Sequence, residues 1–167
     1  MSELRTNRIV PRDGLVSGTG KAGGVIQVRN TTFTDIETIS CDSSFEDTSI
    51  ACSITPTRSD SKVLLSVSVT GEGNAANQRS FTHRVKKVIG GTTTYIQGAT
   101  VSDRVSHLGS TGDLTNDSTT SASSFSISNY MDEPATTDAV TYTLQITYQS
   151  GSGGGTYYVN RNVSEGS

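Results

Sequence analysis

The chain has 167 residues, of which 32% are apolar and 17% charged, with no Trp. Its formal net charge of −3 gives no reason to expect nucleic-acid or membrane-surface binding. No apolar stretch approaches the ~20 residues of a membrane helix, and the polar, Arg-bearing start is not a secretory signal. We therefore expect one domain, made in a cytoplasm, with a thin core and 50 Ser and Thr residues suited to half-exposed strands.

Residues 1–24 are expected to form a separate N-terminal segment. The first ten residues have only Leu4, Ile9 and Val10 to bury, and a turn signal and a Gly-rich linker follow them. Such a segment does not hold its own fold, so it is either disordered or anchored to another protein. Leu4, Arg5, Ile9 and Val10 are the candidate particle anchor.

The linker contains a formal GxGxxG motif, Gly18 to Gly23. A dinucleotide site needs a strand before this motif and a helix after it. Here the motif leads into the β-branched, strand-like stretch Val25–Val28. We therefore expect a linker and no bound cofactor.

From residue 25 onward the sequence predicts strands and no helix, because apolar and polar residues alternate with a period of two. The expected strands are Val25–Val28, Phe33–Ile39, Ile50–Ile54, Val63–Val69, Arg79–Val88, Thr94–Ile96, Phe125–Met131, Val140–Tyr148 and Thr156–Arg161. Gly90-Gly91 is a good hairpin signal. The pattern predicts an all-β domain over residues 25–163, an antiparallel β-sandwich or jelly roll with an extended N-terminal anchoring segment, and a tail at 164–167.

The stretch Ala139–Arg161 is expected to be a hairpin around which the other strands are organised. From Val140 to Tyr148 apolar residues alternate with Thr and Gln without a break, which indicates one dry face and one wet face. The Gly-rich stretch that follows should turn the chain back into the last strand. There Tyr157 and Tyr158 face opposite ways, so that one lies in the core and the other lies outside, where it either stacks on a sugar or a neighbouring subunit or shields a sheet edge.

Two cysteines flank an acidic loop between candidate strands. A disulfide between Cys41 and Cys52 would staple that hairpin, whereas a cytoplasm would keep both thiols reduced, so free, partly buried thiols are the alternative. Zinc sites need about four ligands at short paired spacings. No metal site is therefore expected.

We expect no enzyme. The two histidines, His83 and His107, have no recognisable nucleophile or ligand partners in the sequence. The adjacent carboxylates Asp132 and Glu133 are a formal candidate for a glycosidase pair, but neighbouring strand residues point to opposite faces and would diverge. Recognition is expected in loops instead, with the polar stretch 109–124 preferred.

Several stretches together carry a resemblance to a known family. They are Phe33–Ile36, Ser53–Thr57 followed by Ser61–Leu65, Asp132–Thr137, Val140–Tyr142 and Tyr158–Arg161. In this order and spacing, with the Ser2–Asn7 start, they resemble small virion proteins of marine (cyanobacterial) bacteriophages, described as tail-fibre or structural proteins. The resemblance covers residues 1–163. It implies a non-enzymatic, β-rich component of the virion, a homotrimer that contacts other phage virion proteins.

A small tail fibre or adhesin that attaches through its N-terminus and contacts a host surface glycan is the leading interpretation. The candidate receptor or subunit contacts are Asp113, Asn116, Asp117, Tyr157 and Tyr158. A capsid-surface fibre or decoration protein is one alternative. A free-standing carbohydrate-binding module is another, because a sandwich with polar loops permits it.

Overall fold

A computed structural model of the chain describes residues 25–42, 44–75, 80–99, 106–111, 122–148 and 154–161. These residues form nine strands: β1 (Glu37–Cys41), β2 (Glu46–Ile54), β3 (Val63–Ala75), β4 (Phe81–Ile89), β5 (Thr92–Ile96), β6 (Gly109–Ser110), β7 (Ala122–Asp132), β8 (Val140–Tyr148) and β9 (Gly155–Val159). The described residues include no helix that could span a membrane.

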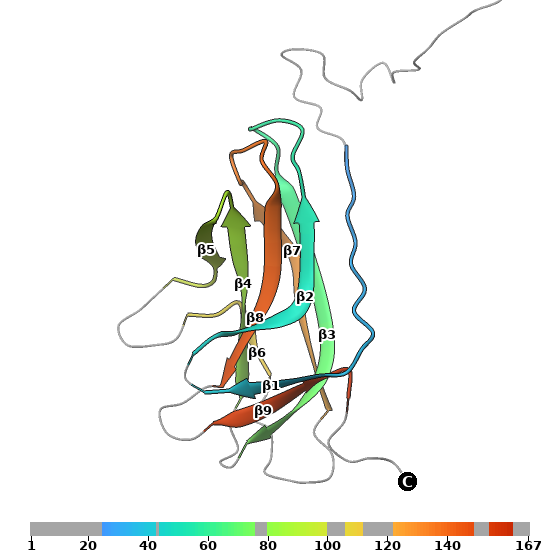
Figure 1. Cartoon of the computed structure of the whole chain (residues 1–167), viewed down its shortest axis with the longest axis vertical. Coiled ribbons are helices and arrows are strands. Elements are labelled where there is room, and N and C mark those ends of the chain that lie inside the picture. Colours follow the sequence, from blue (N-terminus) through green and yellow to red (C-terminus); the bar gives the residue numbers. More distant parts are fainter. Residues whose placement is uncertain are drawn as a thin grey trace, which may run out of the picture.

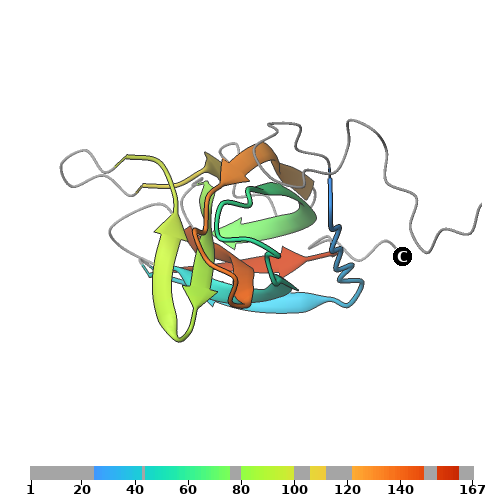
Figure 2. The same cartoon turned by 90° about the horizontal axis from the view of Figure 1, so that it is seen from above.

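The strands form two antiparallel sheets that pack against each other (Figures 1 and 2). The first sheet has the order β1-β9-β3-β7, and the second has the order β2-β8-β4-β5, with β6 paired to β4. Each sheet contributes one face to a shared interior, as in other sandwiches. The expected all-β sandwich is confirmed.

The expected hairpin between β8 and β9, the last two strands of the chain, is wrong. β8 pairs with β2 and β4 in the second sheet, whereas β9 pairs with β1 and β3 in the first. The chain therefore crosses from one sheet to the other between Tyr148 and Gly154. Alternation determines which face of a strand is buried but not which strand lies beside it, so both strands fit the pattern without forming a hairpin.

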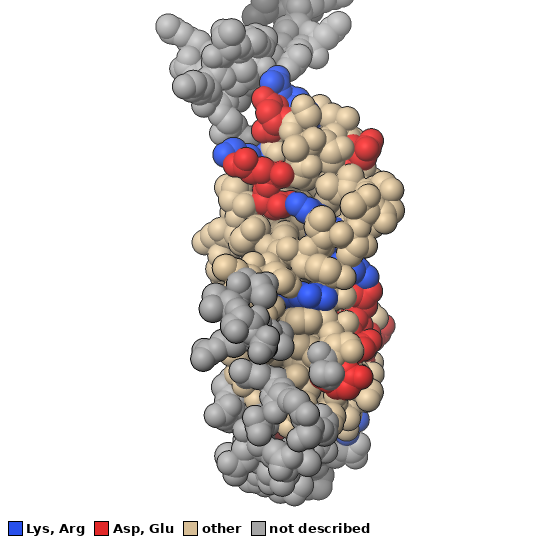
Figure 3. Space-filling view, turned by 90° about the vertical axis from the view of Figure 1, so that its left-hand side faces the viewer, with Lys and Arg blue, Asp and Glu red and all other residues tan. Residues whose placement is uncertain are grey.

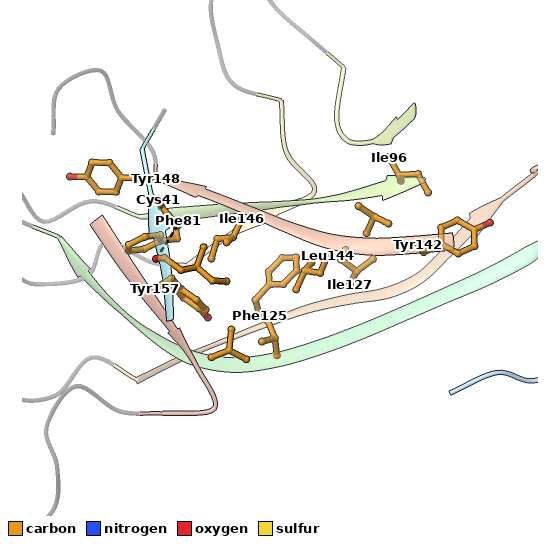
Figure 4. Close-up of a cluster of buried hydrophobic side chains, with 14 of the residues drawn as sticks. Cys41, Phe81, Ile96, Phe125, Ile127, Tyr142, Leu144, Ile146, Tyr148 and Tyr157 are labelled. Carbon is orange, nitrogen blue, oxygen red and sulfur yellow. Dashed lines mark hydrogen bonds between the residues drawn. The ribbon is translucent and has the colours of Figure 1, made fainter. Parts of the chain in front are cut away.

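The interior is filled by large side chains from both sheets. Its buried members are Ile39, Cys41, Val63, Val69, Phe81, Val85, Ile96, Phe125, Ile127, Val140, Tyr142, Leu144, Ile146, Tyr148, Tyr157 and Val159. Figure 4 shows Cys41, Phe81 and Tyr157 gathered at one end, with Phe125, Leu144 and Ile146 further along the sandwich. Burying each large apolar side chain contributes about 1.5–3 kcal/mol, so this interior provides most of the driving force for folding.

The outer face of β8 is buried as well, contrary to the expected wet face. Thr143, Gln145 and Thr147 are 9%, 5% and 0% exposed. Two of them bond to chain on the β2 side: Thr147 Oγ1 donates to the carbonyl of Asp42 in the β1–β2 connection at 3.0 Å, and Gln145 Nε2 donates to Asp47 Oδ1 on β2 at 2.7 Å. β8 lies between β2 and β4, and side chains from its neighbours cover the outer face that the alternation alone marks as wet.

The hairpin between β4 and β5 is confirmed. Gly90 and Gly91 form its two-residue loop with φ values of 54° and 82°, a conformation that glycine adopts without a steric penalty.

The expected strand at Val25–Val28 is not formed. Residues 25–36, which we call the N-terminal strap, run as extended chain along the side of the sandwich and join no sheet among the described residues (Figure 1). Phe33 packs against the core. Asn160 fixes the lower end, because its Nδ2 donates to the carbonyls of Phe33 and Asp35 at 2.9 and 3.1 Å.

Candidate functional site

The outer face of the second sheet carries a stack of two aromatic rings and one guanidinium, which we call the Arg84 stack. The Cζ of Arg84 lies 3.6 Å from the ring centroid of Tyr95 on β5 and 3.9 Å from that of Phe45, which precedes β2. Both separations are within the range of attractive cation–π contacts. The stack therefore joins β5, β4 and the β1–β2 connection across the sheet surface.

Hydrogen bonds hold the guanidinium in place against the two rings. Arg84 Nε donates to Gln145 Oε1 at 2.7 Å, and its Nη1 donates to Gln97 Oε1 at 3.0 Å. The Gln145 amide in turn donates to Asp47, which also accepts a hydrogen bond from Lys86. Partial burial acts to raise the pKa of Asp47, but the bonds from Lys86 and Gln145 outweigh it and hold this pKa below its usual value.

The local sequence explains how this surface is built. On β4, Val85 faces the core, so Arg84 and Lys86 on either side of it project from the opposite face. On β2 the register shifts between Asp47 and Ala51, and the buried hydroxyl of Thr48 donates to the carbonyl of Leu144 at 2.9 Å. This irregularity pulls the start of β2 over β8 and brings Asp47 within reach of Lys86.

The Arg84 stack presents a ring, amides and balanced charges rather than a reactive centre. Tyr95 is 47% exposed, which leaves part of its ring open to solvent. Opposite charges lie near one another on an otherwise largely uncharged surface in the view of Figure 3. Such a surface suits hydroxyl-rich or neutral partners better than polyanions. The sequence signal was the pair of long cationic side chains flanking Val85, and our sequence reasoning missed it.

Of the two candidate contact residues on β9, one is buried and the other is partly exposed. Tyr157 is 1% exposed and lies 5.3 Å, between ring centroids, from Phe81, so it is a core residue and not a contact. Its neighbour Tyr158 is partly exposed on the outer face, where the guanidinium of Arg161 lies 4.5 Å from its ring centroid. The expectation that one Tyr is buried and the other available is confirmed, and only Tyr158 remains a candidate.

The other candidate contacts lie outside the described residues. These are the particle anchor, Leu4, Arg5, Ile9 and Val10, and the loop residues Asp113, Asn116 and Asp117. They stay predictions.

Both cysteines are free in this structure. Cys41 is buried on β1 in the first sheet, whereas Cys52 is partly exposed on β2 in the second. The disulfide considered as a staple is therefore not formed, and the stretch between these residues is a crossing between sheets rather than a hairpin. Burial, with the nearby carboxylates of Glu46 and Asp42, raises the pKa of the Cys41 thiol to about 12.

The adjacent carboxylates Asp132 and Glu133 diverge, as expected. Asp132 is buried and contacts Lys87, whereas Glu133 is exposed and accepts a hydrogen bond from Lys62 at 2.6 Å. In the described part of the chain, no group of three or more His, Cys, Asp or Glu side chains is placed to hold a metal ion.

The N-terminal strap carries four of the eight large hydrophobic side chains that are exposed in the described chain. Val25 and Val28 are 85% and 77% exposed, and Ile26 and Ile36 are 54% and 62% exposed. These four exposed aliphatic side chains within twelve residues are candidates for contact with another surface.

No protein-family model matches the chain, and no curated protein sequence matches it significantly.

Proposed function

We propose that this protein is a non-enzymatic structural protein of a bacteriophage virion, a small trimeric tail fibre or adhesin that attaches to the particle through its N-terminal segment. Two lines of argument support it. The sequence resembles small virion proteins of marine bacteriophages, and the described chain is a β-sandwich, an architecture suited to a rigid structural subunit.

The observation that carries the proposal is the exposed N-terminal strap. Its four aliphatic side chains stay more than half exposed, although Phe33 and the Asn160 hydrogen bonds hold the strap against the sandwich. Association with other subunits would remove this apolar surface from water, at about 25 cal/mol for each Å² buried. An ordered, adhesive strap beside the route to residues 1–24 is what an assembling subunit requires.

The proposal is tested in particles. Phage particles from cells that express the tagged chain are purified on a density gradient and analysed by mass spectrometry. We expect the chain to band with the particles and a variant lacking residues 1–24 to remain in the soluble fraction. A full-length chain that stays soluble while other virion proteins assemble normally would reject the virion assignment.

A carbohydrate-binding role is a second candidate, and the Arg84 stack favours it. A partly open Tyr ring beside amide side chains is the combination that binds sugars by stacking and hydrogen bonding. Calorimetry of the folded chain against host surface glycans tests this role, with Tyr95→Ala as the variant. Binding that is lost in Tyr95→Ala but kept in the control Thr93→Ala would support the role, and equal binding by both variants would exclude this face.

A further inference from the structure

His83 is a buried histidine whose ring has no satisfactory polar surroundings. It is 0% exposed, and neither Nδ1 nor Nε2 makes a hydrogen bond of normal geometry. Its imidazole lies parallel to the ring of Phe125 at 4.0 Å between centroids, and Tyr157 meets it edge-on at 5.8 Å. The ring is thus held as a neutral aromatic, because an imidazolium there would lose its hydration and gain only the backbone carbonyl of Gly109, with no opposite charge beside it.

The titratable groups around His83 offer no compensating charge. The stretch before β6 contributes the imidazole of His107, whose Nδ1 is also buried without a hydrogen bond, and β9 contributes the phenol of Tyr157. The core residues that face it from β7 and β8 are Phe125 and Ile146, neither of which titrates. On β3, Glu72 is in register with Tyr158 and therefore belongs to the opposite face of its sheet.

His83 also belongs to the shortest strand pairing in the described fold, that of β4 with β6. β6 has two residues and pairs with β4 at Thr82 and His83 alone. Backbone bonds extend this junction from Leu108 N to the carbonyl of His83 and from Thr111 N to that of Phe81, both at 2.8 Å, and Phe81 N donates to Thr111 Oγ1 at 2.9 Å. Gly98 N also donates to the carbonyl of His107 at 3.2 Å.

Packing links this short strand to the imidazole through Phe125. A Cβ at Gly109 would lie 2.2 Å from Cε2 of the Phe125 ring, so β6 rests directly on the ring that stacks on His83. Movement of the imidazole therefore disturbs the surface on which β6 lies. Because the β4–β6 pairing is short, separating it should cost less free energy than separating the long pairings of β8.

We propose that the junction of β4 and β6 is an acid-sensitive latch, in which protonation of His83 moves its ring toward water and releases residues 106–111 from β4. The inference does not depend on the proposed function, because it rests on burial, stacking and pairing alone.

The direction of the effect follows from the pKa values. Burial, with a smaller contribution from His107, lowers the pKa of His83 to about 3 from its ordinary 6.5, although the carbonyl of Gly109 opposes the shift. Above pH 6.5 the ring is neutral in closed and open forms alike, and the latch has its full stability. As the pH falls from 6.5 toward 3, His83 takes up a proton in the open form but not in the closed form. The stability of the closed form relative to the open form therefore decreases progressively.

Hydrogen exchange of the full chain tests the proposal, at pH 7.5 and pH 4.5 with rates corrected for intrinsic pH dependence. Opening should rise up to ~100-fold for residues 106–111, since each pH unit below 6.5 allows at most tenfold. Residues 140–148 of β8 are the internal control and should not change. His83→Phe keeps the stack without a titrating group and should abolish the increase, whereas His107→Gln should retain it.

A second measurement keeps the test decisive if His83→Phe does not fold. The imidazole resonances of His83 in the wild-type chain should not titrate near pH 6.5 while the amides of Leu108 and Thr111 remain protected. Ordinary titration of His83 with the latch closed would overturn the proposal. The same acid opening in a folded His83→Phe variant would overturn it equally.

Discussion

The hydroxyl of Tyr142, on β8 of the second sheet, donates a 2.8 Å hydrogen bond to the carboxylate of Asp132, on β7 of the first. Lys87 on β4 completes the group, with its Nζ 3.0 and 3.2 Å from the two oxygens of the same carboxylate. Burial, with the carboxylate beside it, raises the pKa of Tyr142, so the phenol stays protonated and remains a donor. The two sheets are therefore joined by a largely buried polar contact as well as by apolar packing.

Removing the shared acceptor should cost more than removing one donor. Asp132→Ala leaves a mostly buried ammonium and a buried hydroxyl without a partner, and we expect a loss of about 3 kcal/mol in the free energy of unfolding. Tyr142→Phe removes one hydrogen bond and should cost about 1 kcal/mol. Chemical denaturation measures both. Glu133→Ala, which removes an exposed ion pair, is the matched control, and an equal effect of all three would contradict the account.

The buried outer face of β8 makes a second prediction. Gln145→Ala should destabilise the fold by about 2 kcal/mol, because it removes the acceptor of Arg84 and the donor to Asp47. Thr143→Asp should destabilise as well, although the alternation alone marks that position as exposed. Melting temperatures provide the comparison, with Ser126→Ala on an exposed face as the control. A harmless Thr143→Asp would show that this position is not buried between Ala51 on β2 and Lys86 on β4.

The Arg84 stack predicts that charge alone is not sufficient at position 84. Arg84→Lys keeps the charge but loses the planar group between Phe45 and Tyr95 and the fork that binds two amides, so we expect a loss of about 1 kcal/mol in the free energy of unfolding. A double-mutant cycle with Phe45→Leu isolates the stacking energy. Additive effects of the two substitutions would mean that the Phe45 ring does not contribute to holding Arg84.

Thiol reactivity should separate the two cysteines. With its pKa raised to about 12 and its side chain buried, Cys41 should react with a thiol reagent at pH 8 only as fast as the protein unfolds. Cys52 is partly exposed and should react first. Cys52→Ser should abolish the fast phase and Cys41→Ser should keep it, and a fast phase in Cys52→Ser would contradict the burial of Cys41.

The sequence predicted the sheet architecture well because period-two alternation reports burial directly. Ile50 to Ile54, Val63 to Val69 and the Gly90-Gly91 turn all lie in the expected elements. Alternation failed where tertiary contacts decide the outcome. Val25 to Val28 has the composition of a strand, but the chain is extended there without a neighbouring strand in the described fold.

The candidate site was less predictable because it depends on contacts between residues far apart in the chain. Arg84 and Tyr95 lie on the two strands of the expected β4–β5 hairpin, but the sequence does not show that Phe45 reaches them, since the crossing from β1 to β2 brings it there. The opposite orientations of Tyr157 and Tyr158 followed from strand geometry, but which of the two is buried depended on the partner strands of β9.

The exposed strap predicts that the chain associates, and light scattering of the purified full-length chain at micromolar concentration measures this most directly. We predict the mass of a trimer for the wild type. A Val25→Ser, Val28→Ser double variant, which keeps Phe33 and the Asn160 hydrogen bonds, should shift toward monomer with its β-sheet circular dichroism unchanged. A wild-type chain that is monomeric with residues 1–24 intact would contradict the account of this protein as an assembling structural subunit.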